Sequence, residues 1–166
     1  MSKILVLNGS PRKDGNTKLL AEAFAEGAKA AGNTATVIDV AFKNIAGYTE
    51  TPVKDDMEEV YAAAREADAL IIASPMYFYG LTGQLKCCYD RLHDLGDNHI
   101  TKTGMLLCAA DGSEEAFDGV VNIQKANAAF DNWEYVGEVR ACGVAEPGDI
   151  KNTGFLEEAK AFAAKF

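Results

Sequence analysis

The sequence predicts an α/β fold in which a five-stranded parallel sheet carries helices on both faces. Short apolar runs alternate with helical patterns along the whole chain. The run Ile4–Leu7 is apolar throughout and the run Asp68–Ala73 is apolar after its first residue, as strands buried on both faces are. Right-handed crossovers between parallel strands then put helices on both faces of the sheet, which gives three layers.

The first elements of the chain follow in a regular order. Ile4–Leu7 is expected to form the first strand. In Thr17–Ala31, apolar side chains recur at helical spacing, and Gly32 with Asn33 supplies a helix stop. Thr34–Val40 alternates between apolar and polar residues, which predicts the second strand.

The middle of the chain repeats this pattern. Phe42–Lys54 contains Gly47 and Pro52 and is expected to be a loop. Two aspartates precede the predicted helix Met57–Glu66, where negative charge suits the helix dipole. Asp68–Ala73 predicts the third strand. A loop, Ser74–Gly83, and a helix, Gln84–Leu95, come next.

The last third supplies the remaining elements. Thr103–Ala109 and Trp133–Val144 are predicted as the fourth and fifth strands. The short loop Ala110–Ser113 leads into the helix Glu114–Phe130, and Phe155–Phe166 is expected to be a closing helix. Since the sequence contains no internal repeat, low-complexity segment or linker, residues 1–166 are expected to form a single domain.

The composition limits the class of protein. The chain has 166 residues and a formal net charge of -9, and 48% of its residues are hydrophobic. This acidic balance argues against a nucleic-acid or anionic-membrane partner. The first apolar run has only four residues, so no secretory leader is expected, and no run is long enough to span a membrane.

The cysteine pattern points to a reducing compartment. Cys87 and Cys88 are adjacent, and with Cys108 and Cys142 they show no zinc or iron–sulfur spacing. We expect four reduced thiols, mostly buried, in a cytoplasmic protein. No metal site is expected.

The loop after the first strand has the features of a phosphate site. It reads Gly9-Ser-Pro-Arg-Lys-Asp-Gly-Asn-Thr17 and lies between a strand and a helix start, where unpaired N–H groups carry partial positive charge. Side chains of Ser10, Arg12, Asn16 and Thr17 add hydrogen-bond donors. Arg12, Lys13 and Lys18 are expected to gather there. The sequence matches neither a Walker A loop nor a GxGxxG turn.

The loop after the third strand is rich in aromatic residues. Ser74–Gly83 contains Tyr77, Phe78 and Tyr79, which are costly to expose unless they cover something. One interpretation is that they close the edge of the core. The other is that they form a wall for a flat ring, with Pro75 stiffening the loop and glycines allowing close approach.

The two loops are expected to meet in space. A common strand order for doubly wound parallel sheets, and the one expected here, is 2-1-3-4-5. In this order strands one and three are neighbours at the point where the chain reverses its direction across the sheet, and ligands bind there at the carboxyl ends of the strands. A phosphate site beside a ring site describes a mononucleotide with a large ring, and FMN fits this description. The loop after strand four, Ala109-Ala-Asp-Gly-Ser113, borders the same crevice, either as a plain turn with a helix cap or as a contact to the ring.

These motifs resemble a known family. The stretch from Gly9 to Thr17, the segment Asp68–Lys86, Tyr89-Asp-Arg-Leu92 and Gly143–Ile150 are similar to the NADPH-dependent FMN reductase and iron–sulfur flavoprotein branch of the flavodoxin-like superfamily. The resemblance covers nearly the whole chain and implies a flavodoxin-like three-layer sandwich. Because Phe42–Lys54 contains no cysteine, the cluster motif of the iron–sulfur members is missing.

The resemblance also implies roles for particular residues. The phosphate of FMN would be held by Ser10, Arg12, Asn16 and Thr17. The ring would be lined by Pro75, Met76, Tyr77, Phe78 and Gly80, and approached by Ala110, Asp111 and Gly112. Asp111 departs from the glycine-rich third loop of many relatives, and a carboxylate near the ring would disfavour an anionic reduced flavin. The resemblance further implies a homodimer.

Three functions follow as hypotheses. The first is an FMN-dependent NAD(P)H oxidoreductase that reduces a small acceptor, with no catalytic side chain required because the flavin carries the chemistry. The second is a flavodoxin-like electron carrier that docks to redox partners through its acidic surface. The third is an FMN-binding module without turnover. His93 and the Cys87–Cys88 pair are expected on a helix surface and a buried helix face, respectively.

Overall fold

A parallel sheet of five strands forms the centre of the protein. The computed structural model describes residues 1–51 and 53–166, and its strands lie in the order β2-β1-β3-β4-β5. This confirms the predicted order 2-1-3-4-5. The strands are β1 (Lys3–Asn8), β2 (Thr34–Asp39), β3 (Ala69–Pro75), β4 (Lys102–Cys108) and β5 (Glu134–Ala141).

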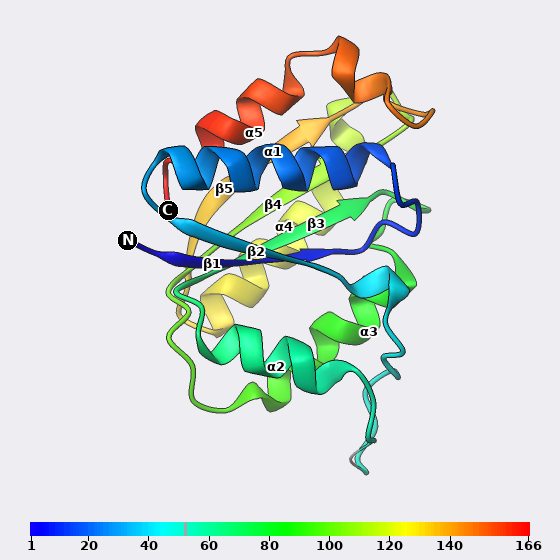
Figure 1. Ribbon diagram of the computed structural model, residues 1–166. Helices are drawn as coiled ribbons and strands as arrows, with labels where there is room; N and C mark the ends of the chain where they lie inside the picture. The colour runs from blue at the N-terminus through cyan, green and yellow to red at the C-terminus, as the bar shows by residue number, and fades with distance from the viewer. Residues whose placement is uncertain (52) are drawn as a thin grey trace.

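Helices cover both faces of this sheet, so the fold is a flavodoxin-like three-layer sandwich. One face carries α1 (Asn16–Ala30) and α5 (Phe155–Ala163), as Figure 1 shows. The other face carries α2 (Met57–Arg65), α3 (Gly83–Arg91) and α4 (Asp118–Phe130). Since every strand is parallel to its neighbours, all five strands end at the same edge of the sheet.

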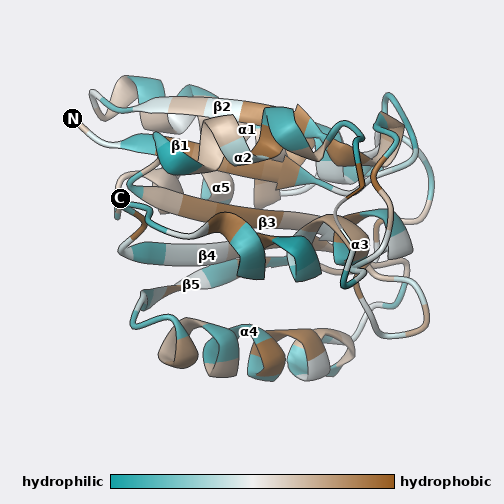
Figure 2. Cartoon of the chain, turned by 90° about the horizontal axis from the view of Figure 1, so that it is seen from below, coloured by the Kyte–Doolittle hydropathy of each residue, from teal (hydrophilic) through white to brown (hydrophobic). Residues whose placement is uncertain are grey.

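The core consists of one apolar cluster on each face of the sheet. The side chains of β1 and β3 are almost completely buried because helices cover both of their faces. Figure 2 shows β3 as hydrophobic over most of its length. Alternate residues of each strand therefore belong to different clusters: Leu5 and Leu7 face α2 and α3, whereas Ile4 and Val6 face α1.

Helices α1 and α5 approach each other closely at Gly27. A β-carbon at this position would lie 2.3 Å from the carbonyl oxygen of Lys160. Next to this contact, the rings of Phe24, Phe162 and Phe166 pack edge to face or tilted, with centroids 5.3 to 6.0 Å apart. This packing fixes α1, whose N-terminus faces the first loop.

Several predicted boundaries differ from the structure. The expected helix Gln84–Leu95 becomes a 3₁₀ turn at Leu92–Leu95 and ends before Gly96, whose φ of 68° stops the helix. The expected helix Glu114–Phe130 begins with a 3₁₀ turn, Glu114–Phe117. A further 3₁₀ turn at Asp149–Asn152 was not predicted. Pro52, which the prediction placed in the loop before α2, lies outside the described residues.

The remaining boundary differences are at strand and helix ends. β5 is shorter than the predicted Trp133–Val144, because Cys142–Val144 turn away toward the loop after β4. α5 ends at Ala163 instead of Phe166. Among the described residues, no helix is both long and apolar enough to cross a membrane.

Candidate functional site

The loops that follow the strands are joined by backbone hydrogen bonds along one edge of the sheet. Gly9 N–H donates to the Ala73 carbonyl at 2.9 Å, which connects the loop after β1 to β3. Met76 N–H donates to the Cys108 carbonyl at 2.8 Å, and Ala109 N–H donates to the Ala141 carbonyl at 2.9 Å. The predicted phosphate loop, aromatic loop and third loop therefore lie next to one another (Figure 1).

A buried threonine connects the first loop to the aromatic loop. Thr82 Oγ1 donates to the Gly9 carbonyl at 2.9 Å and accepts from Leu85 N–H at 3.4 Å, which caps α3. Its own N–H donates to Ser74 Oγ at 3.2 Å. Gly9 permits this approach, because a β-carbon there would lie 2.5 Å from Thr82 Oγ1 and 2.6 Å from Leu85 Cβ.

The loop after β1 folds back on itself around Ser10. Ser10 is buried, and its N–H donates to Asn8 Oδ1 at 3.2 Å. Its hydroxyl lies 3.3 Å from both the N–H and the carbonyl oxygen of Arg12. Gly15 N–H donates to the Arg12 carbonyl at 3.1 Å, which closes the turn directly before α1.

The N-terminus of α1 presents unpaired donors to this loop. Leu19 N–H bonds to the Gly15 carbonyl at 3.2 Å, but the N–H groups of Asn16, Thr17 and Lys18 have no acceptor among the described residues. The Gly15 cap has no side chain to satisfy them. Such N–H groups, together with the positive end of the helix dipole, favour an anion.

Two of the predicted phosphate ligands have side chains that already bond to the segment after β5. The Asn16 amide bonds to backbone groups of Val144, Glu146, Gly148 and Ile150. Arg12 Nη1 donates to the Ala145 carbonyl at 3.0 Å. The Asn16 side chain is therefore occupied, and only the backbone N–H of this residue remains to bind a phosphate.

The predicted cluster of cations is also smaller than expected. Lys18 Nζ lies 2.7 Å from Asp39 Oδ2, at the end of β2, so its charge is paired. Asn8 Nδ2 donates to Asp39 Oδ1 at 2.9 Å, which ties the same carboxylate to the end of β1. Arg12 and Lys13 are exposed and form no ion pair with any residue that the structure describes.

The aromatic loop forms a tight two-residue hairpin. Tyr77 and Gly80 exchange two backbone hydrogen bonds of 3.0 Å. Phe78 and Tyr79 at its tip have φ values of 50° and 59°, a left-handed conformation that bulky residues adopt only at a cost. Phe78 is fully exposed and Tyr79 largely so. Hence these rings do not close the core, which was one of the two interpretations of this loop.

The residues just before the hairpin are better packed. Pro75 is the last residue of β3, and it is half-buried like Met76. Met76 packs against the core cluster that contains α3 and α4. The base of the loop is therefore anchored, while its tip extends into solvent.

The third loop is open to solvent at the same edge. Ala110, Asp111 and Gly112 are all exposed. The Asp111 carboxylate accepts from Ser113 N–H at 2.9 Å, and its carbonyl accepts from Gly143 N–H at 2.8 Å. Asp111 thus shapes its own turn and joins this loop to the one after β5.

The cysteines are free thiols that fall into two groups. Cys88 and Cys108 are buried, and burial raises the pKa of each thiol to about 12, although a hydrogen bond with Thr17 opposes the shift at Cys108. Cys87 and Cys142 are half-buried, so the prediction of a buried Cys87–Cys88 pair holds only for Cys88. Within residues 1–51 and 53–166, no group of three or more His, Cys, Asp or Glu could hold a metal ion.

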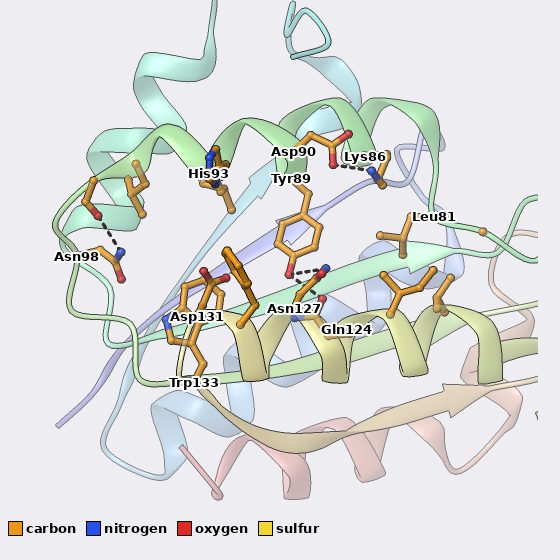
Figure 3. A pocket seen from close by; sticks show the side chains of 17 residues that line it. Leu81, Lys86, Tyr89, Asp90, His93, Asn98, Gln124, Asn127, Asp131 and Trp133 are labelled. Carbon is orange, nitrogen blue, oxygen red and sulfur yellow. Dashed lines mark hydrogen bonds and ion pairs between the residues drawn. The ribbon is translucent and has the colours of Figure 1, made fainter. Parts of the chain in front are cut away.

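A large groove lies between α3 and α4 and reaches Gly80 and Leu81 at the end of the aromatic loop (Figure 3). Its volume is about 640 Å³. Tyr89 Oη donates to Gln124 Oε1 at 2.8 Å across it and accepts from Asn127 Nδ2 at 3.4 Å, as the dashed lines in Figure 3 show. His93 and Trp133 also line it, which places His93 on the surface as predicted.

Sequence reasoning gave no role to several residues that shape the site. Thr82 and Asp39 join neighbouring loops, and the segment Val144–Ile150 covers the start of α1. The capping role of Thr82 could have been predicted from the sequence, since threonine is a preferred helix cap and α3 begins directly after it. The partners of Asn16 had none, because they lie more than 120 residues further along the chain.

Comparison with known proteins identifies the family. Residues 2–129 match the model of the NADPH-dependent FMN reductase family. An iron–sulfur flavoprotein from Methanocaldococcus jannaschii is 32% identical over 102 residues, which is 56% of this chain and 53% of that protein. A putative NAD(P)H-dependent FMN-containing oxidoreductase from Bacillus subtilis is 33% identical over 92 residues, or 54% and 51%. The matches thus span about half the length of these two relatives.

A solved structure supports the fold. An FMN-dependent NADH-azoreductase from Bacillus anthracis, determined in complex with FMN, superposes with a TM-score of 0.71 at 16% identity, covering 98% of each chain. At this identity the similarity concerns the fold alone. Since the family model covers most of the sequence, the chain belongs to the NADPH-dependent FMN reductase family.

Proposed function

We propose that residues 1–166 form a single FMN-binding domain that passes hydride equivalents from NADH or NADPH to a small acceptor. One observation carries this proposal: the unpaired N–H groups at the start of α1 lie at the same edge of the sheet as the exposed aromatic hairpin. The first feature suits a phosphate and the second suits a flat ring, so the residues present fit FMN.

The phosphate end would be held mainly by the backbone. The N–H groups of Asn16, Thr17 and Lys18 are the donors, and Ser10 holds the turn that precedes them. Arg12 would add a guanidinium to the phosphate while its Nη1 stays on the Ala145 carbonyl. Thr17 is buried at the second residue of α1.

The ring end would be covered by the hairpin and the third loop. Phe78 and Tyr79 gain apolar contact by covering a ring, which offsets their exposure and their strained backbone. Pro75, Met76 and Gly80 supply the anchored base of that wall. Ala110, Asp111 and Gly112 would border the ring from the neighbouring loop.

The protein itself would bind and orient the cofactor and would exclude water from it. Bound FMN would supply the hydride and electron transfer chemistry, so the protein would need no side-chain acid or base for it. The Asp111 carboxylate is held by Ser113 N–H. Its negative charge at the edge of the site would disfavour extra negative charge on the ring.

We further propose that the protein is a cytoplasmic homodimer. Four free thiols are typical of a reducing compartment. Ile123 and Phe130 are exposed apolar residues that line the groove between α3 and α4, which supports this face as the subunit contact. Light scattering on the purified protein should give the mass of a dimer, and Phe130→Glu should reduce it to that of a monomer.

An anaerobic titration tests the function. The purified protein is loaded with FMN, freed of excess cofactor and titrated with NADH and NADPH while flavin absorbance is followed. We expect rapid bleaching by at least one donor, and steady-state turnover when a quinone or azo dye is added. Tight FMN binding without bleaching would favour an electron carrier instead. Failure to bind FMN at all would refute the proposed function.

A further inference from the structure

The side chain of Asn16 is saturated by one distant loop. Its Nδ2 donates to the carbonyls of Val144 at 3.3 Å and Glu146 at 2.9 Å. Its Oδ1 accepts from the N–H groups of Gly148 at 3.0 Å and Ile150 at 3.3 Å. A primary amide has two donor hydrogens and two acceptor lone pairs, so this set uses all of them.

Asn16 is therefore unable to offer its side chain to a ligand without releasing that loop. Its side chain is buried at the start of α1, where its backbone N–H remains unpaired. The loop it holds, residues 143–150, leads from the end of β5 into the 3₁₀ turn Asp149–Asn152. We call residues 143–150 the β5 loop.

The β5 loop in turn holds Arg12. Arg12 Nη1 donates to the Ala145 carbonyl at 3.0 Å, although the two residues are 133 positions apart. The N–H groups of Ala145 and Glu146 both donate to Asp149 Oδ2, at 3.1 and 2.8 Å. The peptide groups around Ala145 are thus fixed by Asn16 from one side and by Asp149 from the other.

A single hydrogen bond from an exposed arginine orders its side chain only weakly unless the acceptor is rigid. Ordering a long side chain costs rotamer entropy, and this cost falls when the partner is already in place. Arg12 forms no ion pair with a described residue, so the Ala145 carbonyl is its only fixed anchor there. Its remaining guanidinium hydrogens are free to reach a phosphate.

We propose that Asn16 is a positioning residue: it fixes the β5 loop so that the Ala145 carbonyl holds the Arg12 guanidinium at the phosphate site. Asn16 then acts on the phosphate through Arg12 and not through its own amide. Asp149 has the same role from within the loop. This inference rests on the proposed FMN site and names which of its residues contact the phosphate.

A double-mutant cycle on the apoprotein tests it, with FMN and riboflavin as paired ligands. Riboflavin lacks the phosphate, so effects confined to FMN come from the phosphate end. Arg12→Ala should weaken FMN binding about 10- to 100-fold, the loss expected for one hydrogen bond to a charged group. Asn16→Ala should weaken FMN binding too, and each single variant should leave riboflavin affinity within about twofold, because a contact to the phosphate is absent there.

The coupling between the two residues is the decisive result. If Asn16 works through Arg12, the double variant should bind FMN within about twofold of the weaker single variant. Losses that multiply would mean that the two side chains act independently and would overturn the inference. An equal loss of FMN and riboflavin in Asn16→Ala would do the same.

Asp149→Ala gives a second test in case Asn16→Ala folds poorly. Removing a negative charge should by itself tighten binding of an anion. The positioning role predicts the opposite, weaker FMN binding that Asp149→Asn restores in part, because an amide oxygen still accepts from Ala145 and Glu146. Asp97→Ala is the matched control. It removes an exposed carboxylate in the loop before β4, at the opposite edge of the sheet from the proposed site, and should leave FMN affinity unchanged.

Hydrogen exchange gives a readout that needs no flavin. Amides of the β5 loop should exchange faster in Asn16→Ala apoprotein than in the unaltered protein, while amides of β3 stay protected. Unchanged exchange in the loop would overturn the inference even if FMN binds. Failure of the unaltered protein to bind FMN would instead refute the proposed function, and with it the role given to Arg12.

Discussion

Thr82 Oγ1 donates a hydrogen bond of 2.9 Å to the carbonyl oxygen of Gly9, across 73 positions of sequence. Both residues are buried, and the same hydroxyl accepts from Leu85 N–H at the start of α3. One side chain thereby joins the loop after β1 to the helix after β3. The two halves of the proposed flavin site depend on this contact for their relative position.

Replacing this threonine by valine should loosen the connection without changing side-chain size. Thr82→Val removes both the helix cap and the donor to the Gly9 carbonyl, so the free energy of unfolding should fall by about 2 kcal/mol. Urea unfolding followed by circular dichroism measures this. Thr82→Ser keeps the hydroxyl and is the control. A serine variant as unstable as the valine variant would show that the methyl group, not the hydroxyl, matters.

The strained hairpin should be easy to stabilise at the expense of its aromatic wall. Asn-Gly is the favoured pair for a two-residue turn with positive φ at both positions. Phe78→Asn combined with Tyr79→Gly should raise the free energy of unfolding by about 1 kcal/mol or more. The same variant should bind FMN more weakly, because the rings are lost.

An alanine pair separates strain from ring contacts. Phe78→Ala with Tyr79→Ala removes both rings but keeps a β-carbon at each left-handed position. It should therefore weaken FMN binding without the gain in stability. Equal stability of the two double variants in thermal unfolding would contradict a strained turn.

Acid should lower the free energy of unfolding, and Asp55 should contribute to this loss. Burial opposes ionisation of its carboxyl group, but hydrogen bonds from Ala46 N–H and the Arg91 guanidinium outweigh burial, and the pKa of Asp55 is lowered. A lowered carboxyl pKa gives stability that is present above the pKa of the unfolded chain, about 4, and is lost as pH falls below it.

Asp55→Asn tests this pH dependence. The amide has no charge to pair with Arg91, so the variant should be less stable than the unaltered protein at pH 7. The difference in unfolding free energy should shrink as pH falls from 5 toward 3, because Asp55 becomes protonated in the unfolded chain before it does so in the native protein. A difference that stays constant between pH 7 and pH 3 would exclude the charge as its cause.

The four thiols should differ in reactivity in the native protein. Alkylation requires the thiolate and access, and the buried Cys88 and Cys108 lack both because burial raises the pKa of each to about 12. Iodoacetamide at pH 8 should label Cys87 and Cys142 first, as peptide mass spectrometry can measure. Denatured protein should label at all four cysteines. Early labelling of Cys108 would mean that the β4 end opens readily.

The sequence was sufficient to predict the fold because the relevant signals are local. Unbroken apolar runs such as Ile4–Leu7 are typical of central parallel strands, and the order 2-1-3-4-5 is a common one for doubly wound sheets. The first loop was found for the same reason, since its residues are contiguous and adjoin a helix start. Boundaries such as that of α3 at Arg91 depend on weak terminal contacts and were less predictable.

Side-chain directions at the site were beyond what the sequence could predict. Asn16 and Lys18 are donor residues beside a phosphate loop, which is why both were expected to serve it. In the structure, the Asn16 amide bonds to the β5 loop and the Lys18 ammonium pairs with Asp39 instead. Those partners lie in the loop after β5 and at the end of β2, and no local pattern specifies which distant group will meet a given side chain.

The reach of Asn16 also has a consequence for biosynthesis. Its four partners lie 128 to 134 positions further along the chain. As the polypeptide leaves the ribosome, the first loop and α1 emerge early, but this amide stays unpaired until the fifth strand and the residues after it have followed. Nascent chains released before residue 150 should therefore lack a finished N-terminal loop, even though every residue of that loop has already been made.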